Sequence, residues 1–149
     1  MKRVLTVALL VLVCVSCLTS CSKIEQEVGK AVSVAAVEAV ADELDKQGVT
    51  YEFADEQALA EAEQELAQAL EQPLQGDMTA ALLGETTNEQ TGDWVRYWTF
   101  GFSTTADAEA CAQYASEQYK TEIEQGKAIV INGGYIVNIT VSSIEIQQD

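Results

Sequence analysis

Apolar residues recur at helical spacing through the segment that follows residue 22. The positions that fall three or four residues apart are Ile24, Val28, Ala31, Val32, Ala35, Ala39, Val40 and Leu44. This period predicts one long helix over 23–47, and Gly48 follows as a C-terminal stop. The stretch 31–41 is apolar nearly all round, so the helix needs cover on more than one side.

Two uses of this helix are open from the sequence. It can pack on its own chain, in which case we expect residues 30–44 to contact the domain that follows. It can instead associate with a partner or with other copies of the protein, and Val34 and Val37 would then carry the contact. The oligomeric state is not fixed by the pattern.

From residue 49 onward, strand and helix patterns alternate. The predicted strands are 49–53, 78–83, 94–102, 128–131 and 135–141, and residues 144–146 can extend the last one. One predicted helix lies between an N-cap at Asp55 and Pro73, and another between an N-cap at Thr104 and Gly126. Asn132-Gly133-Gly134 predicts a tight turn between the last two strands.

This order of elements resembles a ferredoxin-like βαββαβ sandwich with an extra C-terminal hairpin strand. The resemblance implies an α+β fold in which both helices cover one face of the sheet. Trp98, Phe100 and Phe102 alternate along one strand, and we expect them to point into the core. The opposite face would then be lined by Thr50, Glu52, Thr79, Val95, Tyr97, Thr99, Asn138 and Thr140. Many unrelated functions use this architecture, so it assigns none.

The first 22 residues have a different composition. Lys2 and Arg3 precede a run, 4–15, that is almost wholly apolar, and the tetrad Leu18-Thr19-Ser20-Cys21 follows. Such an order is typical of a secretory signal peptide. The tetrad resembles the lipobox of bacterial lipoproteins, which implies cleavage before Cys21 and acylation of that residue.

The resemblance also implies a location and a domain organisation. The protein would be anchored by its lipid in a bacterial cell membrane and would face away from the cytoplasm. Residues 1–20 would be the cleaved signal peptide, 21–48 the anchor cysteine with the long helix, and 49–149 an α+β domain.

The charge of the chain excludes some classes of partner. It has eight Lys and Arg residues against 24 Asp and Glu. Loss of Lys2 and Arg3 with the signal peptide would leave six basic against 24 acidic residues, a net charge of −18. A protein that binds nucleic acid needs a basic surface, and so does a protein that lies flat on anionic lipid. We therefore expect no nucleic-acid partner, and a membrane contact only through the acyl anchor.

The side chains that carry most catalytic and metal chemistry are scarce. The sequence has no histidine, which removes the commonest general base and most zinc sites. Cys14 and Cys17 would leave with the signal peptide, so Cys111 would be the one free thiol, on the apolar stripe of a helix. We expect no metal and no cofactor, and a protein that is not an enzyme.

Two features of the domain remain as candidate chemistry. Glu61, Glu63 and Glu65 resemble a solvated helix flank, although paired carboxylates keep a hydrolase as a remote alternative. Trp94, Arg96 and Tyr97 lie close together on one strand, and aromatic residues with arginine dominate binding hot spots.

The leading functional hypothesis is therefore a non-enzymatic binding module for a protein or small ligand of the cell envelope. The alternative is a structural component that assembles through the Ala/Val-rich helix 23–47.

Overall fold

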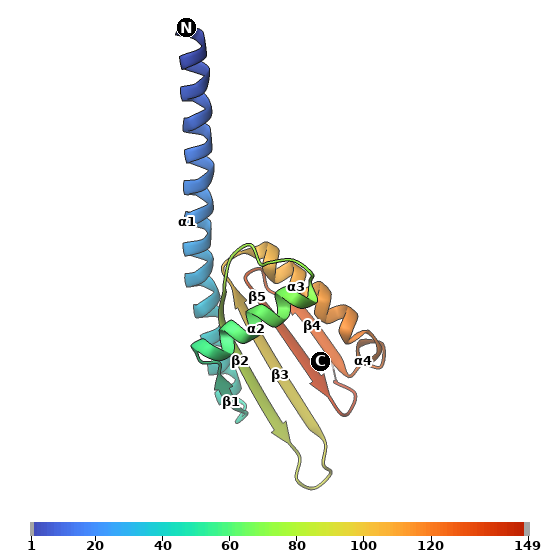
Figure 1. Ribbon diagram of the computed structural model, residues 1–149. Helices are drawn as coiled ribbons and strands as arrows, with labels where there is room; N and C mark the ends of the chain where they lie inside the picture. Colours follow the sequence, from blue (N-terminus) through green and yellow to red (C-terminus); the bar gives the residue numbers. More distant parts are fainter. Residues whose placement is uncertain (1, 148–149) are drawn as a thin grey trace.

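A computed structural model gives the arrangement of the chain, with the first helix running past one side of a sheet (Figure 1). The structure describes the backbone of residues 2–147 and the side chains of residues 23–147. The Cys21 side chain and the predicted signal peptide lie outside the residues whose side chains are described. The elements are α1 (Lys2–Lys46), β1 (Thr50–Phe53), α2 (Glu56–Ala69), β2 (Met78–Thr87), β3 (Trp94–Phe102), α3 (Thr105–Gln118), α4 (Lys120–Glu124), β4 (Ala128–Asn132) and β5 (Ile136–Ser142).

The predicted α+β class and the order of elements are confirmed. The five strands form one sheet in the order β1-β2-β3-β5-β4, and every neighbouring pair is antiparallel. Strands β3 and β4 are therefore parallel to each other with β5 between them, so β3-α3-β4 is a split βαβ unit, consistent with a ferredoxin-like sandwich. In the first half, β1 pairs directly with β2 after the chain has passed through α2.

The main core lies between the sheet and the two helices α2 and α3. Its fully buried centre is Phe102 with Val137, and Leu66 of α2 and Cys111 of α3 pack onto it. The expectation that Trp98, Phe100 and Phe102 share the inward face is confirmed, because all belong to this core.

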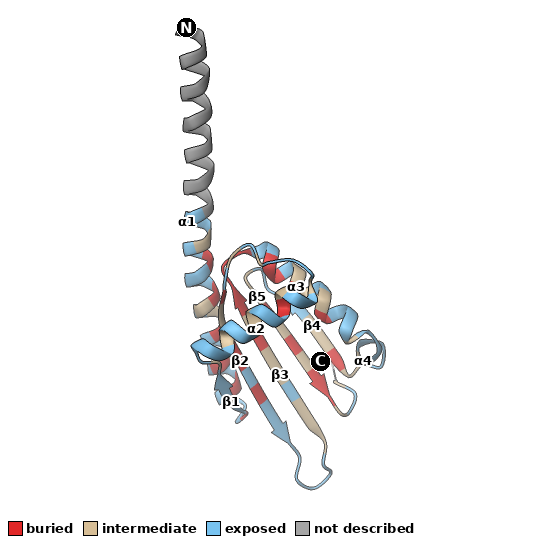
Figure 2. Cartoon of the chain, viewed as in Figure 1, coloured by how far each residue is buried: buried red, intermediate tan, exposed pale blue. Residues whose placement is uncertain are grey.

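Helix α1 covers part of the opposite face of the sheet. Val37, Ala41 and Leu44 are buried there in a second core with Leu82 of β2. Figure 2 shows that α1 carries buried segments where it runs beside the sheet. The expectation that residues 30–44 contact the domain is confirmed, so this segment is part of the fold.

The face that α1 presents to the sheet differs from the predicted one. Ile24, Val28 and Val32 are exposed, whereas Gly29 and Ser33 are buried. The reason is close approach. A Cβ on Gly29 would overlap the Ser103 carbonyl oxygen, and the Ser33 hydroxyl lies 2.6 Å from that of Thr79. Small side chains let the helix backbone come near the sheet, and larger apolar residues then occupy the outer side.

Several element boundaries also differ from the predicted ones. Strand β2 continues past residue 83 to Thr87, because its pairing with β3 extends to Thr87 opposite Trp94. The helix after Thr104 breaks at Tyr119 into α3 and α4. Residues 144–146 do not extend β5, and the Ile146 amide instead bonds back to the Gly126 carbonyl.

The two faces of β1 are exchanged relative to the prediction. Tyr51 packs with the α1 core and donates a hydrogen bond to Asp45 at 2.9 Å. The neighbouring residues Thr50 and Glu52 therefore point to the α2 face and do not line the α1 face.

Candidate functional site

The predicted binding trio on β3 does not form one surface. Trp94 and Arg96 lie two positions apart and share the face that carries α2 and α3. Tyr97 lies on the opposite face and packs with the α1 core. The alternation of a β-strand separates these residues, although they are close in sequence.

Arg96 is already engaged within the domain. Its guanidinium carbon lies 4.7 Å from the centre of the Trp94 ring, and its Nε donates to Glu85 at 2.9 Å. Both partners of the ion pair are about half exposed, so the pair contributes little to stability. Trp94 and Arg96 thus form a small rim on this face, with the arginine charge compensated by Glu85.

A groove along one side of α2 is the better candidate. Residues Ala58, Ala62, Glu65 and Ala69 recur at helical spacing and form one stripe on this helix. Two adjoining cavities of 240 and 370 Å³ follow the stripe and share Ala62 and Phe100. We call this feature the α2 groove. Together, the two volumes fall in the roughly 300–1,000 Å³ range of ligand sites.

The floor and far wall of the α2 groove are mainly apolar. Besides the α2 stripe and Phe100, the residues that line its two cavities are Glu52, Phe53, Ala54, Asp55, Leu66, Met78, Ala81, Leu83, Trp98, Cys111 and Tyr114, together with Leu82, whose side chain packs in the α1 core on the other face. Leu83 is 44% exposed, an uncovered apolar side chain on the sheet. Trp98 is partly buried and stacks on Tyr119 of the α3–α4 junction, which fixes its ring in the floor.

The sequence of α2 explains why the groove exists. Asp55 caps the helix by accepting from the Ala58 amide at 2.8 Å, which fixes where its first turn lies. Leu59, Leu66 and Leu70 hold the helix on the core along one side. The adjacent stripe has alanine at three of four positions, and alanine is too short to fill the space over Phe100.

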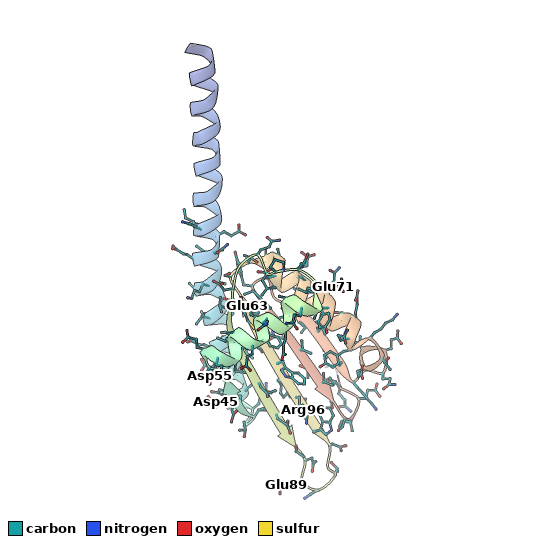
Figure 3. All side chains as sticks on the ribbon, in the orientation of Figure 1. Asp45, Asp55, Glu63, Glu71, Glu89 and Arg96 are labelled. Atoms are coloured by element: carbon teal, nitrogen blue, oxygen red, sulfur yellow. The ribbon has the colours of Figure 1, made fainter. Side chains whose placement is uncertain are left out.

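Acidic side chains are distributed along α2, and Glu52, Asp55 and Glu65 line the groove itself. Asp55 and Glu71 mark the two ends of α2 with Glu63 between them, as Figure 3 shows. Glu63 is used in the fold, because it accepts a hydrogen bond from the Met78 amide at 2.9 Å. Glu65 belongs to the stripe and lines the first cavity. Within residues 23–147, the ion pairs are Lys46–Glu43 and Arg96–Glu85, and neither involves Glu65.

Cys111 lies in the wall of the first cavity, but its thiol is unreactive. The residue is 5% exposed, and burial raises the pKa of its thiol to about 12. The thiol is therefore neutral at physiological pH, and the thiolate is the nucleophilic form. This supports the expectation that Cys111 serves as a small apolar residue.

The buried carboxylate of Asp107 has a structural explanation. It accepts from the amides of Gln75 and Gly76 at 2.9 and 2.8 Å, and from the Thr104 hydroxyl at 2.8 Å. These bonds tie the loop after α2 to the start of α3, where a carboxylate is favoured by the helix dipole. Asp107 therefore positions the wall of the groove and does not face a ligand.

Metal binding and membrane crossing are two further functions on which the described residues bear. In the part of the chain with described side chains, no group of three or more His, Cys, Asp or Glu side chains is placed to hold a metal ion. Among the same residues, no helix combines the length and the apolar character needed to cross a bilayer.

The α2 groove was not among the predicted sites. The feature of the sequence that could have indicated it is the small size of Ala58, Ala62 and Ala69. The periodicity of apolar residues does not distinguish these alanines from larger core residues. Comparison with family models found no match, and neither the curated proteins nor the solved structures gave one. The geometry of the groove is therefore the basis for assigning a function.

Proposed function

We propose that the protein is a lipid-anchored binding module of the bacterial cell envelope and that the α2 groove holds its partner. An acyl group on Cys21 anchors the protein in a membrane, with the domain facing away from the cytoplasm. The sheet serves as a rigid platform for binding, without enzymatic activity. The observation that carries the binding role is the apolar floor of Trp98, Phe100 and Leu83, open beside an alanine wall.

Burial of apolar surface is the driving force that this groove offers. A partner that covers about 200 Å² of apolar area gains about 5 kcal/mol at 25 cal/mol per Å². Association costs a similar amount or more, so a groove of this size favours weak or moderate binding unless further contacts add to it. A membrane anchor suits such affinities, because it confines the protein near partners in the same membrane.

The anchor is tested by labelling cells with a radioactive fatty acid. Cys21→Ala should abolish the label and release or mislocalise the protein. Cys17→Ala is the matched control, since it removes another cysteine of the same segment and should leave the label in place. Label that persists after Cys21→Ala would place the acylation elsewhere.

The binding role is tested by quenching of Trp98. In Trp94→Phe, Trp98 is the only tryptophan. The mature lipoprotein is placed in phosphatidylcholine nanodiscs, and an amphipathic Leu/Gln peptide that carries a nitroxide is added. Quenching is expected, and Ala62→Phe should block it by filling the groove. Quenching unaffected by Ala62→Phe would mean that the peptide binds elsewhere.

Assembly through α1 remains a second proposal because of one observation. Ile24, Val28 and Val32 are 60%, 50% and 45% exposed on the side of α1 that faces away from the sheet. Val37, by contrast, is fully buried in its own domain and is not available to a neighbour. Removal of residues 22–47 would destroy the second core, so Val28→Gln with Val32→Gln is the suitable test. If the protein assembles through this face, light scattering should give a lower molecular mass for the double variant than for the parent protein.

A further inference from the structure

We propose that the partner in the α2 groove is a basic amphipathic peptide segment. Its apolar side chains lie on the floor of the groove, and a Lys or Arg side chain meets Glu65. This inference rests on the proposed function, because it names the chemistry of what the same groove binds.

The position of Glu65 is the first reason. The α2 stripe that forms the groove wall is Ala58, Ala62, Glu65 and Ala69, so one carboxylate interrupts an otherwise apolar wall. Glu65 also lines the same cavity as Tyr114 of α3. A carboxylate and an aromatic ring at one cavity are the two groups that attract an ammonium or guanidinium ion.

The charge around the groove is the second reason. From Asp55 to Glu71, both included, the chain has six acidic and no basic residues. Residues 23–147 contain 23 acidic and six basic residues, a net charge of −17. Such a field attracts cationic partners and repels anionic ones. Arg96, the basic residue on this sheet face of β3, is already paired with Glu85.

The length of the groove fixes the size of the occupant. Ala69 lies 11 positions after Ala58, a rise of about 16 Å at 1.5 Å per residue. That length accommodates about five residues of an extended peptide or about three turns of a helix. The two cavities, one on either side of Ala62, then take successive apolar side chains of a short segment.

The experiment compares three nitroxide-labelled peptides of one leucine pattern, in which the polar positions are all Lys, all Gln or all Glu. The protein is the mature lipoprotein with Trp94→Phe in phosphatidylcholine nanodiscs, and quenching of Trp98 gives each Kd. The quenching that remains with Ala62→Phe in the same nanodiscs comes from peptide bound only to lipid, and it is subtracted. The order of affinity should be Lys above Gln above Glu, with the difference reduced at high salt.

Variants of Glu65 locate the effect within the groove. Glu65→Gln should weaken the Lys peptide by about two- to five-fold, as expected for loss of an exposed ion pair, and should weaken the Gln peptide less, because that peptide has no cation to pair with Glu65. Glu117→Gln is the matched control: it changes the net charge equally, is exposed on α3 and lies outside the groove lining. Glu117→Gln should change the affinities of the Lys and Gln peptides only by the small amount that follows from losing one negative charge of the protein.

The outcomes separate this inference from the proposed function. If the Lys and Gln peptides bind equally, the basic partner is refuted while the apolar groove stands. If Glu65→Gln and Glu117→Gln have the same effect, the contact with Glu65 is refuted while the apolar groove stands. If no peptide quenches Trp98 in a manner that Ala62→Phe blocks, the groove is not a peptide site and both proposals fail.

Discussion

Replacing Val37 with alanine should lower the free energy of unfolding by about 2–3 kcal/mol. Val37 has no exposed surface and belongs to the core of Ala41, Leu44 and Leu82 between α1 and the sheet. The change removes two methyl groups, worth about 0.8 kcal/mol each. The cavity that remains adds about 1 kcal/mol, because the Gly101 backbone and the Ser33–Thr79 contact hold the helix in place.

Val34→Ala is the matched control on the same helix, since Val34 is only partly buried. We expect a loss below about 1 kcal/mol for this variant. Both chains, starting at residue 22, are unfolded in urea and followed by tryptophan fluorescence, and the midpoints are compared at equal slope. Equal midpoint shifts would contradict the packing argument. So would a Val37→Ala protein of unchanged stability but altered molecular mass, which would indicate that the residue serves assembly.

Two further effects follow from the buried polar groups. Burial raises the pKa of Cys111 from 9.0 to about 12, so the thiol stabilises the fold below pH 9 and this contribution is lost as the pH rises toward 12. At pH 10 the loss is on the order of 1 kcal/mol, and Cys111→Ala should flatten that part of a urea-midpoint profile against pH. Asp107→Ala should cost about 3 kcal/mol of unfolding free energy and increase hydrogen exchange at the amides of Gln75 and Gly76, which lose their acceptor. Unchanged exchange at these two amides would contradict the role given to Asp107.

Local sequence determined the elements and most of their ends. Asp55 and Thr104 accept hydrogen bonds from the first turns of α2 and α3, as their N-cap positions predict. The aromatic alternation of residues 94–102 predicts both the bounds of β3 and the inward face that contains Phe102. These features depend on residues that are neighbours in the chain, so they can be predicted from short stretches of sequence.

The groove could not be derived in the same way. The pattern identified Ala62 and Ala69 as apolar, but whether an alanine meets a neighbour or leaves a space depends on the distance between α2 and the floor. The predicted binding trio was separated for a related reason. A strand has two faces, and Tyr97 packs on the one that α1 covers.

The sequence by itself determined a long helix followed by an α+β domain, the caps of its helices and its acidic charge, because these depend on composition and on contacts within a few residues. The tertiary structure decided which side of α1 meets the sheet. Gly29 and Ser33 permit a closer approach than Ile24 or Val28, and close packing is favoured over the larger apolar stripe. It also decided that α2 leaves an open groove, since the space beside Ala62 is set by residues of β2, β3 and α3 that lie far away in the chain.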